Sequence, residues 1–381
     1  MSFMNLLLVA LMPILKTLFL SGIGLILAMD RINLLDSNAR HSLNNMVFYV
    51  FTPCLMGAYL AETVTLDVMI QMWFMPINIL ITFIIGSILG WILIKVTGTP
   101  QNLKGLIIGC CAAGNLGNLL LIVIPAICSE SNSPFGETSA CIADGAGFVS
   151  VSMAVGGIYI WSYVYAIMKT SAENSRRGSA SSSSQPLISK VEPVRLLETI
   201  KRISVVTLGK IGSLNLQHLL APSTIGSIIG FVVGVVPLLN QLLIGRSAPL
   251  RVVYSTADIL GEATVPCVTL IVGANLLRGI RRSGIRASVV LGIIFIRFVA
   301  LPLIGVMIVR AAVHFGLVNS DPLYQFVLML HFALPSAMTI GTISQLFEEG
   351  EAECSVIMLW TYAVSALALT LWSTFFMSLV S

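Results

Sequence analysis

Charged residues are scarce in this sequence. Asp, Glu, Lys and Arg make up 10% of its 381 residues, whereas a soluble domain carries roughly 25%. The only polar stretch long enough to suggest a domain covers 169–217 and is rich in Ser, which leaves no room for a soluble catalytic domain. A phosphate-binding glycine loop with its lysine, a nucleophile elbow and cysteines at metal-ligand spacing are also missing. These shortages predict a protein that is not an enzyme, uses no cofactor or metal and binds no nucleic acid.

Long apolar runs fill most of the chain instead, since 56% of the residues are hydrophobic. A bilayer interior about 30 Å thick needs roughly 20 apolar residues for one helix. Ten segments meet that requirement: 6–28, 42–61, 69–94, 105–127, 140–167, 222–244, 252–276, 287–312, 323–346 and 354–379. The first lacks a basic n-region and a small-residue cleavage site, so we interpret it as a retained helix. The sequence therefore predicts an all-α membrane protein with about ten transmembrane helices.

Basic residues lie mostly on one side of these predicted helices. Of the 21 Lys and Arg residues, 16 fall in loops on the side of 169–217, and 3 fall on the other side. Because Lys and Arg accumulate in cytoplasmic loops, we expect 169–217 to be cytosolic and both termini to lie opposite. The Ser-rich part of this loop is typical of a disordered linker, followed by the pattern of an amphipathic helix from Val194 to Ile211. On the opposite side Cys128 and Cys141 flank one loop, and an oxidising compartment there would permit a disulfide.

The two halves of the sequence share a series of matching interruptions. The matches keep their order and recur at offsets of 213 to 218 residues: Pro53 with Pro266, Gly90 with Gly305, Asn115 with Ala333, and Cys141 with Cys354. Each half, 1–168 and 218–381, holds five predicted helices, so the odd number inverts the second half in the membrane. Inverted repeats of this kind build many secondary transporters. The sequence thus predicts a 5+5 inverted repeat and transport by alternating access.

Helix-breaking residues concentrate in the fourth and ninth predicted helices. We expect breaks at Gly117 and Pro125 in the fourth, at Pro335 in the ninth, and at Pro53 and Pro266 in the second and seventh. In hydrocarbon an unpaired amide costs several kcal/mol, so such breaks persist only inside protein or beside a cavity. Two broken helices that cross near the midplane would direct half-helix N-termini, each with unpaired N–H groups and about half a positive charge, into one cavity. Such a cavity suits an anion, particularly a carboxylate.

Small polar side chains lie next to these predicted breaks. Asn118 and Ser336 occupy equivalent positions just past them, with Asn115, Pro335 and Thr339 close by. We predict that Asn118 and Ser336 hydrogen-bond to the substrate and that the other three complete the binding site. The alternative is that these small polar residues only hold neighbouring membrane helices together.

A few ionisable residues fall inside the predicted helices, where such groups are functional candidates by default: Lys16, Asp144, Asp258, Glu262, Arg297 and His331. Asp258 and Glu262 are four residues apart on one helical face. They are candidates for carrying a proton or binding a cation, and one of them is a candidate partner of Arg297. A structural ion pair or an interfacial position is the alternative for each. His331 is either a group that titrates near neutral pH or a satisfied interior hydrogen bonder.

The residue pattern resembles that of the auxin efflux carrier superfamily, and most closely its PIN-LIKES branch in plants. The resemblance rests on two five-helix halves, a short Ser-rich central loop and the sequence N-x-G-N-L-L-x-x-x-I-P in the fourth helix, and is strongest at 115–127 and 332–336. It implies a scaffold domain of helices 1, 2, 6 and 7, a transport domain of helices 3–5 and 8–10, and an indole-3-acetic acid site where helices 4 and 9 cross. Asn118 then matches the family's crossover asparagine, and Pro125 and Pro335 match its crossover prolines.

The resemblance also implies an endoplasmic reticulum membrane location with both termini in the lumen, contact with membrane lipid, and a homodimer formed through the scaffold. The PIN carriers have an Asp–Lys pair at the start of the third helix, whereas here Asp67 is followed by Gln71 at the lysine position. The predicted function is a carrier for auxin-type indole carboxylates. Two alternatives stay open: a cation-coupled organic-anion symporter of the bile-acid type with Asp258 and Glu262 as ion ligands, and a membrane hormone receptor that does not transport.

Overall fold

The structure is a computed structural model, and it describes residues 15–16, 18–64, 70, 72–129, 133–181, 222–245, 248–282, 284–319 and 321–380. Residues 6–14 and 17 of the first predicted helix, Asp67, Gln71 and the predicted amphipathic run from Val194 to Ile211 lie outside these residues. Helices make up the regular structure of the part that is described, and six of them are long and apolar enough to cross a membrane. The prediction of an all-α membrane protein is confirmed.

Each of the ten predicted segments contains helix where the structure describes it. The first is represented by Leu18–Leu27. The others correspond to α2 (Ser37–Met46), η1 (Val47–Phe51) and α3 (Thr52–Thr63); α5 (Phe74–Thr97); α6 (Lys104–Ala112) and α7 (Asn118–Cys128); α8 (Thr138–Tyr159), η3 (Ile160–Val164) and α9 (Tyr165–Ser181); α12 (Pro222–Val235) and α13 (Pro237–Leu243); α14 (Arg251–Glu262) and α15 (Thr264–Arg282); α16 (Ala287–Phe295), η4 (Ile296–Ala300) and α17 (Leu301–His314); α18 (Pro322–Leu330) and α19 (Thr339–Phe347); and α20 (Glu351–Val380).

Two of the prolines predicted to break helices lie in membrane spans that continue past them. Pro53 follows the π-helical turn η1, and the span Ser37–Thr63 continues through it. A wider turn gives the proline ring room beside the carbonyl that it would otherwise strike. Pro266 lies in the first turn of α15, two residues after that helix begins at Thr264, and the span Arg251–Asn275 continues there as well. The predicted breaks at Pro53 and Pro266 are therefore wrong.

The sixth predicted segment, 222–244, is not one straight helix. α12 and α13 meet at a bend of 102°. Val236 between them is extended, with φ −89° and ψ 108°, because the ring of Pro237 disfavours helical backbone at the preceding residue. α13 turns away from the helix bundle, and none of its residues is buried.

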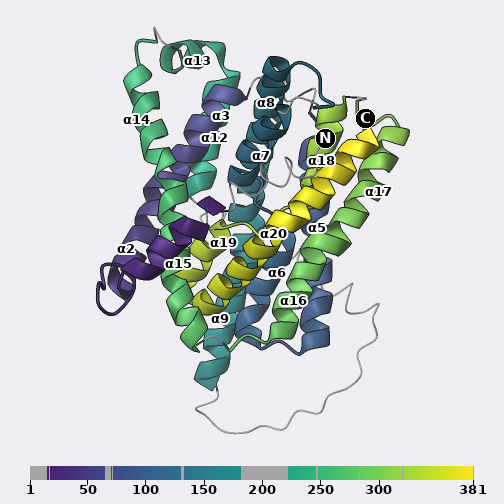
Figure 1. The fold of residues 1–381 in the computed structure, drawn as a ribbon. Coiled ribbons are helices and arrows are strands. Elements are labelled where there is room, and N and C mark those ends of the chain that lie inside the picture. The colour runs from purple at the N-terminus through teal and green to yellow at the C-terminus, as the bar shows by residue number, and fades with distance from the viewer. Residues whose placement is uncertain are drawn as a thin grey trace.

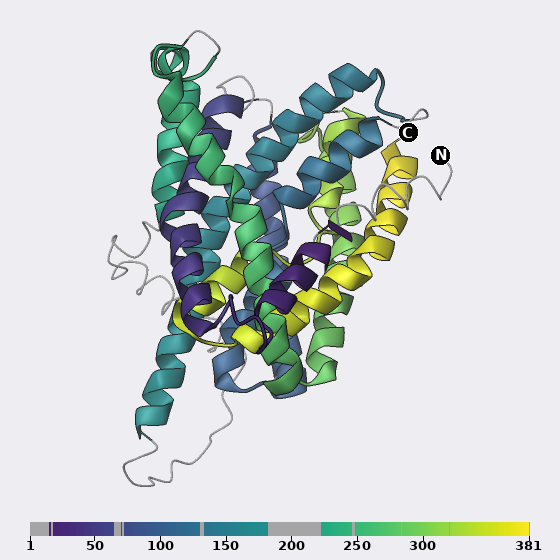
Figure 2. The same cartoon turned by 60° about the vertical axis from the view of Figure 1, so that its left-hand side comes forward.

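The helices form two groups, which Figures 1 and 2 show side by side. In one group α12 and α14 pack on α3. α12 approaches α3 closely because its contact face carries glycines: a Cβ on Gly226 would lie 2.4 Å from the carbonyl oxygen of Pro53, and one on Gly230 would lie 2.3 Å from that of Gly57. Small residues of this kind let membrane helices pack backbone to backbone. The other group contains α5, α16, α17, α18 and α20, with α6, α7, α8 and α19 toward the middle.

Candidate functional site

Two interrupted helices meet in the middle of the molecule. α6 ends at Ala112 and α7 begins at Asn118, while α18 ends at Leu330 and α19 begins at Thr339. The two non-helical segments run antiparallel: the Asn115 N–H donates to the Pro335 oxygen at 2.9 Å, and the Ala337 N–H donates to the Ala113 oxygen at 2.9 Å. Each segment thus supplies partners for backbone groups that the break leaves free. We name this pair of segments, 113–117 and 331–338, the crossover.

The crossover contains two of the residues predicted to break helices. Gly117 caps the start of α7, and Pro335 lies in the second segment. Pro125 is different, because it lies inside α7, which continues to Cys128. The predicted break at Pro125 is wrong: the interruption comes earlier, where the backbone of 113–117 pairs with the other segment. The side chain of Asn118 lies outside what the structure describes.

A tyrosine from α20 connects both crossover segments. The Asn115 Nδ2 donates to the Tyr362 hydroxyl at 2.7 Å, and that hydroxyl donates to the Ser336 carbonyl oxygen at 3.2 Å. The Ser336 side chain is fully buried, and its Oγ donates to the Cys110 carbonyl oxygen at 2.8 Å, near the end of α6. In this conformation Ser336 therefore holds the crossover together, and its hydroxyl hydrogen is already donated to a main-chain oxygen of the protein.

Arg297 binds the crossover from the helix behind it. Its Nη1 donates to the Cys111 carbonyl oxygen at 3.2 Å and its Nη2 donates to that of Pro335 at 3.1 Å. The side chain is fully buried and projects from η4, a π-helical turn of the kind often found at functional sites. The suggested pairing of Arg297 with Asp258 or Glu262 is not what the structure shows, since the guanidinium binds main-chain carbonyls and both acids lie on another element, α14.

The end of α18 has its own polar cap, which centres on His331. Asn78 of α5 donates from Nδ2 to the Leu328 oxygen at 3.0 Å and contacts the His331 Nδ1 at 3.2 Å, while the Ser152 Oγ lies 2.8 Å from the His331 Nε2. Because an amide NH₂ only donates, Nδ1 must accept, and the proton of a neutral ring is on Nε2. His331 is fully buried. Of the two roles considered from the sequence, the structure therefore favours an interior residue whose hydrogen bonds are satisfied.

A cavity opens where the crossover faces the other group of helices. Its free volume is about 70 Å³, and its walls come from the crossover, α3, α8, η3, α15 and α19. Of the predicted binding residues, Asn115 and Thr339 line it, and so does Gly117. Ser336 and Pro335 lie behind this wall and are not among its lining residues. Further lining residues were not predicted from the sequence: Thr52, Met153, Trp161, Thr264 and Thr342.

The remaining ionisable candidates lie away from this cavity. Asp258 is half-buried and Glu262 exposed on α14, beside Glu62 of α3, whose Oε2 accepts a hydrogen bond from the Tyr254 hydroxyl at 2.7 Å. Lys16 and Asp144 are exposed. Among the described residues no group of three or more His, Cys, Asp or Glu side chains is arranged to hold a metal ion.

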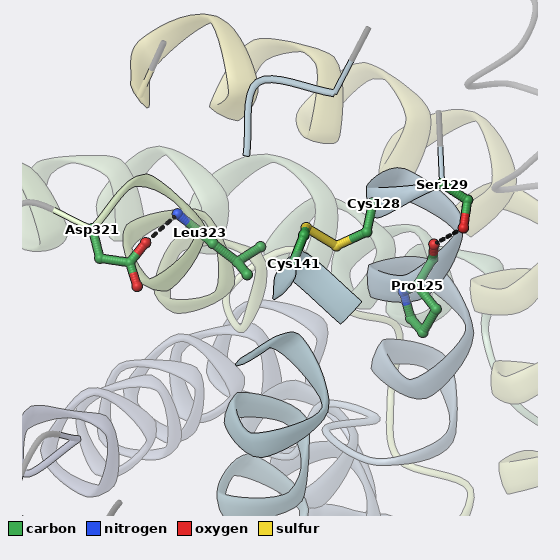
Figure 3. Close-up of a disulfide and its surroundings, with 6 residues drawn as sticks. All are labelled: Pro125, Cys128, Ser129, Cys141, Asp321 and Leu323. Carbon is green, nitrogen blue, oxygen red and sulfur yellow. Dashed lines mark hydrogen bonds between the residues drawn. A yellow bond between two sulfur atoms is a disulfide. The ribbon is translucent and has the colours of Figure 1, made fainter. Parts of the chain in front are cut away.

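Cys128 and Cys141 form a disulfide, the pairing that the sequence left open. Their Cα atoms are 5.6 Å apart, and the bond joins the end of α7 to the first turn of α8 (Figure 3). Asp321 lies in the same region and caps the start of α18, where its Oδ1 accepts from the Leu323 N–H at 2.9 Å. The bond therefore ties the second half of the first broken helix to its neighbour.

Comparisons with known proteins agree with this architecture. Residues 9–373 match the family described as membrane transport protein. The chain is 50% identical to protein PIN-LIKES 1 of Arabidopsis thaliana over 100% of this chain and 81% of that protein. It is 48% identical to protein PIN-LIKES 3, over 97% of each chain, and 48% identical to protein PIN-LIKES 7, over 100% of each chain. The protein thus belongs to the membrane transport protein family and, within it, to the PIN-LIKES branch of the auxin efflux carriers.

Proposed function

We propose that this protein is a carrier for auxin-type indole carboxylates, such as indole-3-acetic acid, across the endoplasmic reticulum membrane, and that it controls how much auxin is available inside the cell. The observation that carries the proposal is the cavity beside the crossover. It lies where two interrupted helices meet and where one group of helices faces the other. In secondary transporters, substrate sites lie at such interruptions, because free backbone groups are available there in an otherwise apolar membrane interior.

The walls of the cavity suit an indole carboxylate. Its free volume of about 70 Å³ is below the roughly 300–1,000 Å³ that small-molecule sites occupy, so the walls must move apart before an indole ring enters. Met153 and Trp161 offer apolar and aromatic surface for an indole ring, while Asn115 and Thr339 offer polar groups. The first turn of α7 adds N–H groups without intrahelical partners, whereas the Ile340 and Gly341 N–H groups of α19 donate to the Ala337 and Met338 oxygens. We assign Asn115, Asn118 and Thr339 to substrate binding, with Ser336 and Pro335 as supports of the crossover.

The two groups of helices supply the moving parts. We assign a scaffold domain to predicted helices 1, 2, 6 and 7, and a transport domain to helices 3–5 and 8–10, built from the inverted repeats 1–168 and 218–381. The cavity lies between α3 and α15 of the first domain and the crossover of the second. A rocking or elevator-like movement between them would expose it to each side in turn. In this arrangement 169–217 is cytosolic, both termini are lumenal, and the scaffold forms a homodimer.

Uptake of radiolabelled indole-3-acetate into proteoliposomes tests this function. The wild-type protein is expected to give saturable uptake, and Asn115→Ala is expected to lower it at least about tenfold, because the variant removes a polar cavity group and its hydrogen bond to Tyr362. Asn38→Ala, the same change at an exposed position, should transport like the wild type. Uptake no higher than in protein-free liposomes would refute the carrier function.

The same assay separates the two alternative functions. Removal of sodium and proton gradients should leave uptake unchanged in a uniporter, whereas a cation-coupled symporter would lose it. The positions of Asp258 and Glu262 away from the cavity favour the uniporter. A non-transporting receptor would bind indole-3-acetate without accumulating it in the vesicle lumen, and measurement of binding and of osmotically sensitive uptake on one preparation distinguishes the two.

A further inference from the structure

Helix dipoles alone do not make the crossover positive. Four half-helices end there: α7 and α19 begin at it, and α6 and α18 stop at it. A helix N-terminus carries about half a positive charge and a C-terminus about half a negative one. The partial positive charges of the two N-termini and the partial negative charges of the two C-termini therefore cancel. The preference of this site for an anion therefore needs a further source of positive charge.

Arg297 is a full positive charge at this point. It is completely buried, and its two Nη groups bind the carbonyl oxygens of Cys111, at the end of α6, and of Pro335, in the crossover. The ionisable side chains that act on it are the thiols of Cys110 and Cys111 and the phenol of Tyr362, all of which are neutral acids at physiological pH. Its Nε has no hydrogen-bond partner among the described residues. Among the described residues no acidic side chain pairs with this guanidinium, so within that part of the chain its charge of about +1 is uncompensated.

Capping a broken helix does not require this charge. At the end of α18, the neutral amide of Asn78 binds the Leu328 oxygen at 3.0 Å, the role that Arg297 performs for Cys111 at the end of α6. Burying a cation without an acidic partner is unfavourable, because the ion loses its hydration. A neutral amide caps a carbonyl without that cost, as Asn78 does, so the guanidinium charge points to a ligand of opposite sign.

The guanidinium lies directly behind the cavity wall. Gly114 lines the cavity, and a Cβ on it would lie 2.6 Å from the Arg297 Nη2. One strand of backbone therefore separates the charge from the space that a substrate would fill. Because the surroundings are apolar and largely closed to water, the field of the guanidinium crosses that distance with little screening.

We propose that Arg297 is the fixed counter-charge that makes the cavity select anions, acting through the crossover backbone without touching the substrate. This inference rests on the proposed carrier function. It names the substrate class by charge: monovalent organic anions are preferred over neutral molecules of the same shape. When the empty transport domain moves across the membrane, it carries the one positive charge of Arg297 with it. When a monovalent anion is bound, the two charges cancel and the domain carries no net charge.

Competition binding with a matched pair of ligands tests the assignment. Indole-3-acetate and the neutral indole-3-acetamide are compared on the wild type, Arg297→Lys and Arg297→Gln. At an effective dielectric constant of about 20 and a separation of roughly 8 Å, loss of the charge lowers the preference for the anion about 30-fold. We expect Arg297→Gln to show that loss with little change for the amide, and Arg297→Lys to keep most of the preference. Since the preference is a ratio within one sample, the amount of folded protein does not affect it.

An unchanged preference in Arg297→Gln, or an equal loss of both ligands, would overturn the assignment. If that variant does not fold, the proposal can be tested with wild-type protein instead, by measuring exchange and net uptake in proteoliposomes under an imposed potassium diffusion potential. Exchange of internal for external indole-3-acetate should be insensitive to voltage, whereas net uptake should depend on it; exchange that follows the voltage would overturn the proposal. The binding assay stays informative if uptake is absent, so failure of the carrier function and failure of this assignment are distinguishable.

Discussion

Removal of one hydroxyl group, in Tyr362→Phe, should disorganise the crossover without changing its packing volume. The hydroxyl accepts from the Asn115 Nδ2 at 2.7 Å and donates to the Ser336 oxygen at 3.2 Å. Each such bond contributes about 1 kcal/mol net, and a buried polar group left unpaired costs about 1–3 kcal/mol. Asn115 borders the cavity and can turn toward it, but the Ser336 carbonyl belongs to a fully buried residue. We therefore expect about 2 kcal/mol of destabilisation of the crossover in its present geometry.

Ligand binding and thermal unfolding measure this effect on purified protein. If the whole 2 kcal/mol acts against the binding-competent crossover, affinity for indole-3-acetate falls by up to about 30-fold. Tyr159→Phe is the matched control, since its hydroxyl makes one long bond, 3.3 Å to the Pro76 oxygen, away from the cavity. Wild-type affinity and unfolding temperature in Tyr362→Phe, or an equal loss in Tyr159→Phe, would show that the crossover is not held as described.

Other variants test the rest of the structure. Maleimide should label Cys128 and Cys141 only after reduction of intact membranes, and Cys128→Ser should lower stability by about 3 kcal/mol, the value for a loop of this size; labelling before reduction would exclude the disulfide. Gly230→Leu should lower the yield of folded protein, because its side chain meets the α3 backbone, whereas Gly22→Leu enters open space and should not; equal yields would contradict the packing of α12. Asn78→Leu should cost about 1–3 kcal/mol in thermal stability by uncapping α18, and an unchanged unfolding temperature would contradict that cap.

The sequence indicates the interrupted helices because their signals are local. Gly117 and Pro335 disturb helical backbone at or next to their own positions, so the breaks can be predicted without knowing what lies nearby. The same rule should have located the bend before Pro237, which was missed because the surrounding apolar run is long enough for one span. Pro125 shows the opposite error, since a helix whose turns pack well in protein continues through it.

The contacts that hold the crossover are not local. Asn115 and Tyr362 are 247 positions apart, and no periodicity within one helix indicates which side chain of another helix will be its partner. From the sequence, Arg297 is an ionisable candidate inside a predicted helix, with the carboxylate of Asp258 or Glu262 as one possible partner. In the structure it binds carbonyl oxygens that exist as free acceptors only because two helices end there. Signals of that kind require the three-dimensional arrangement.

A structure of the protein with indole-3-acetate bound tests the central claim most directly. The account predicts ligand density in the crossover cavity, with the carboxylate against the 114–117 segment and the start of α19 and the ring toward Met153 and Trp161. The protein also has an apolar groove between α3, α12 and α14. Ligand in that groove with the crossover cavity empty would contradict the assignment of the substrate site.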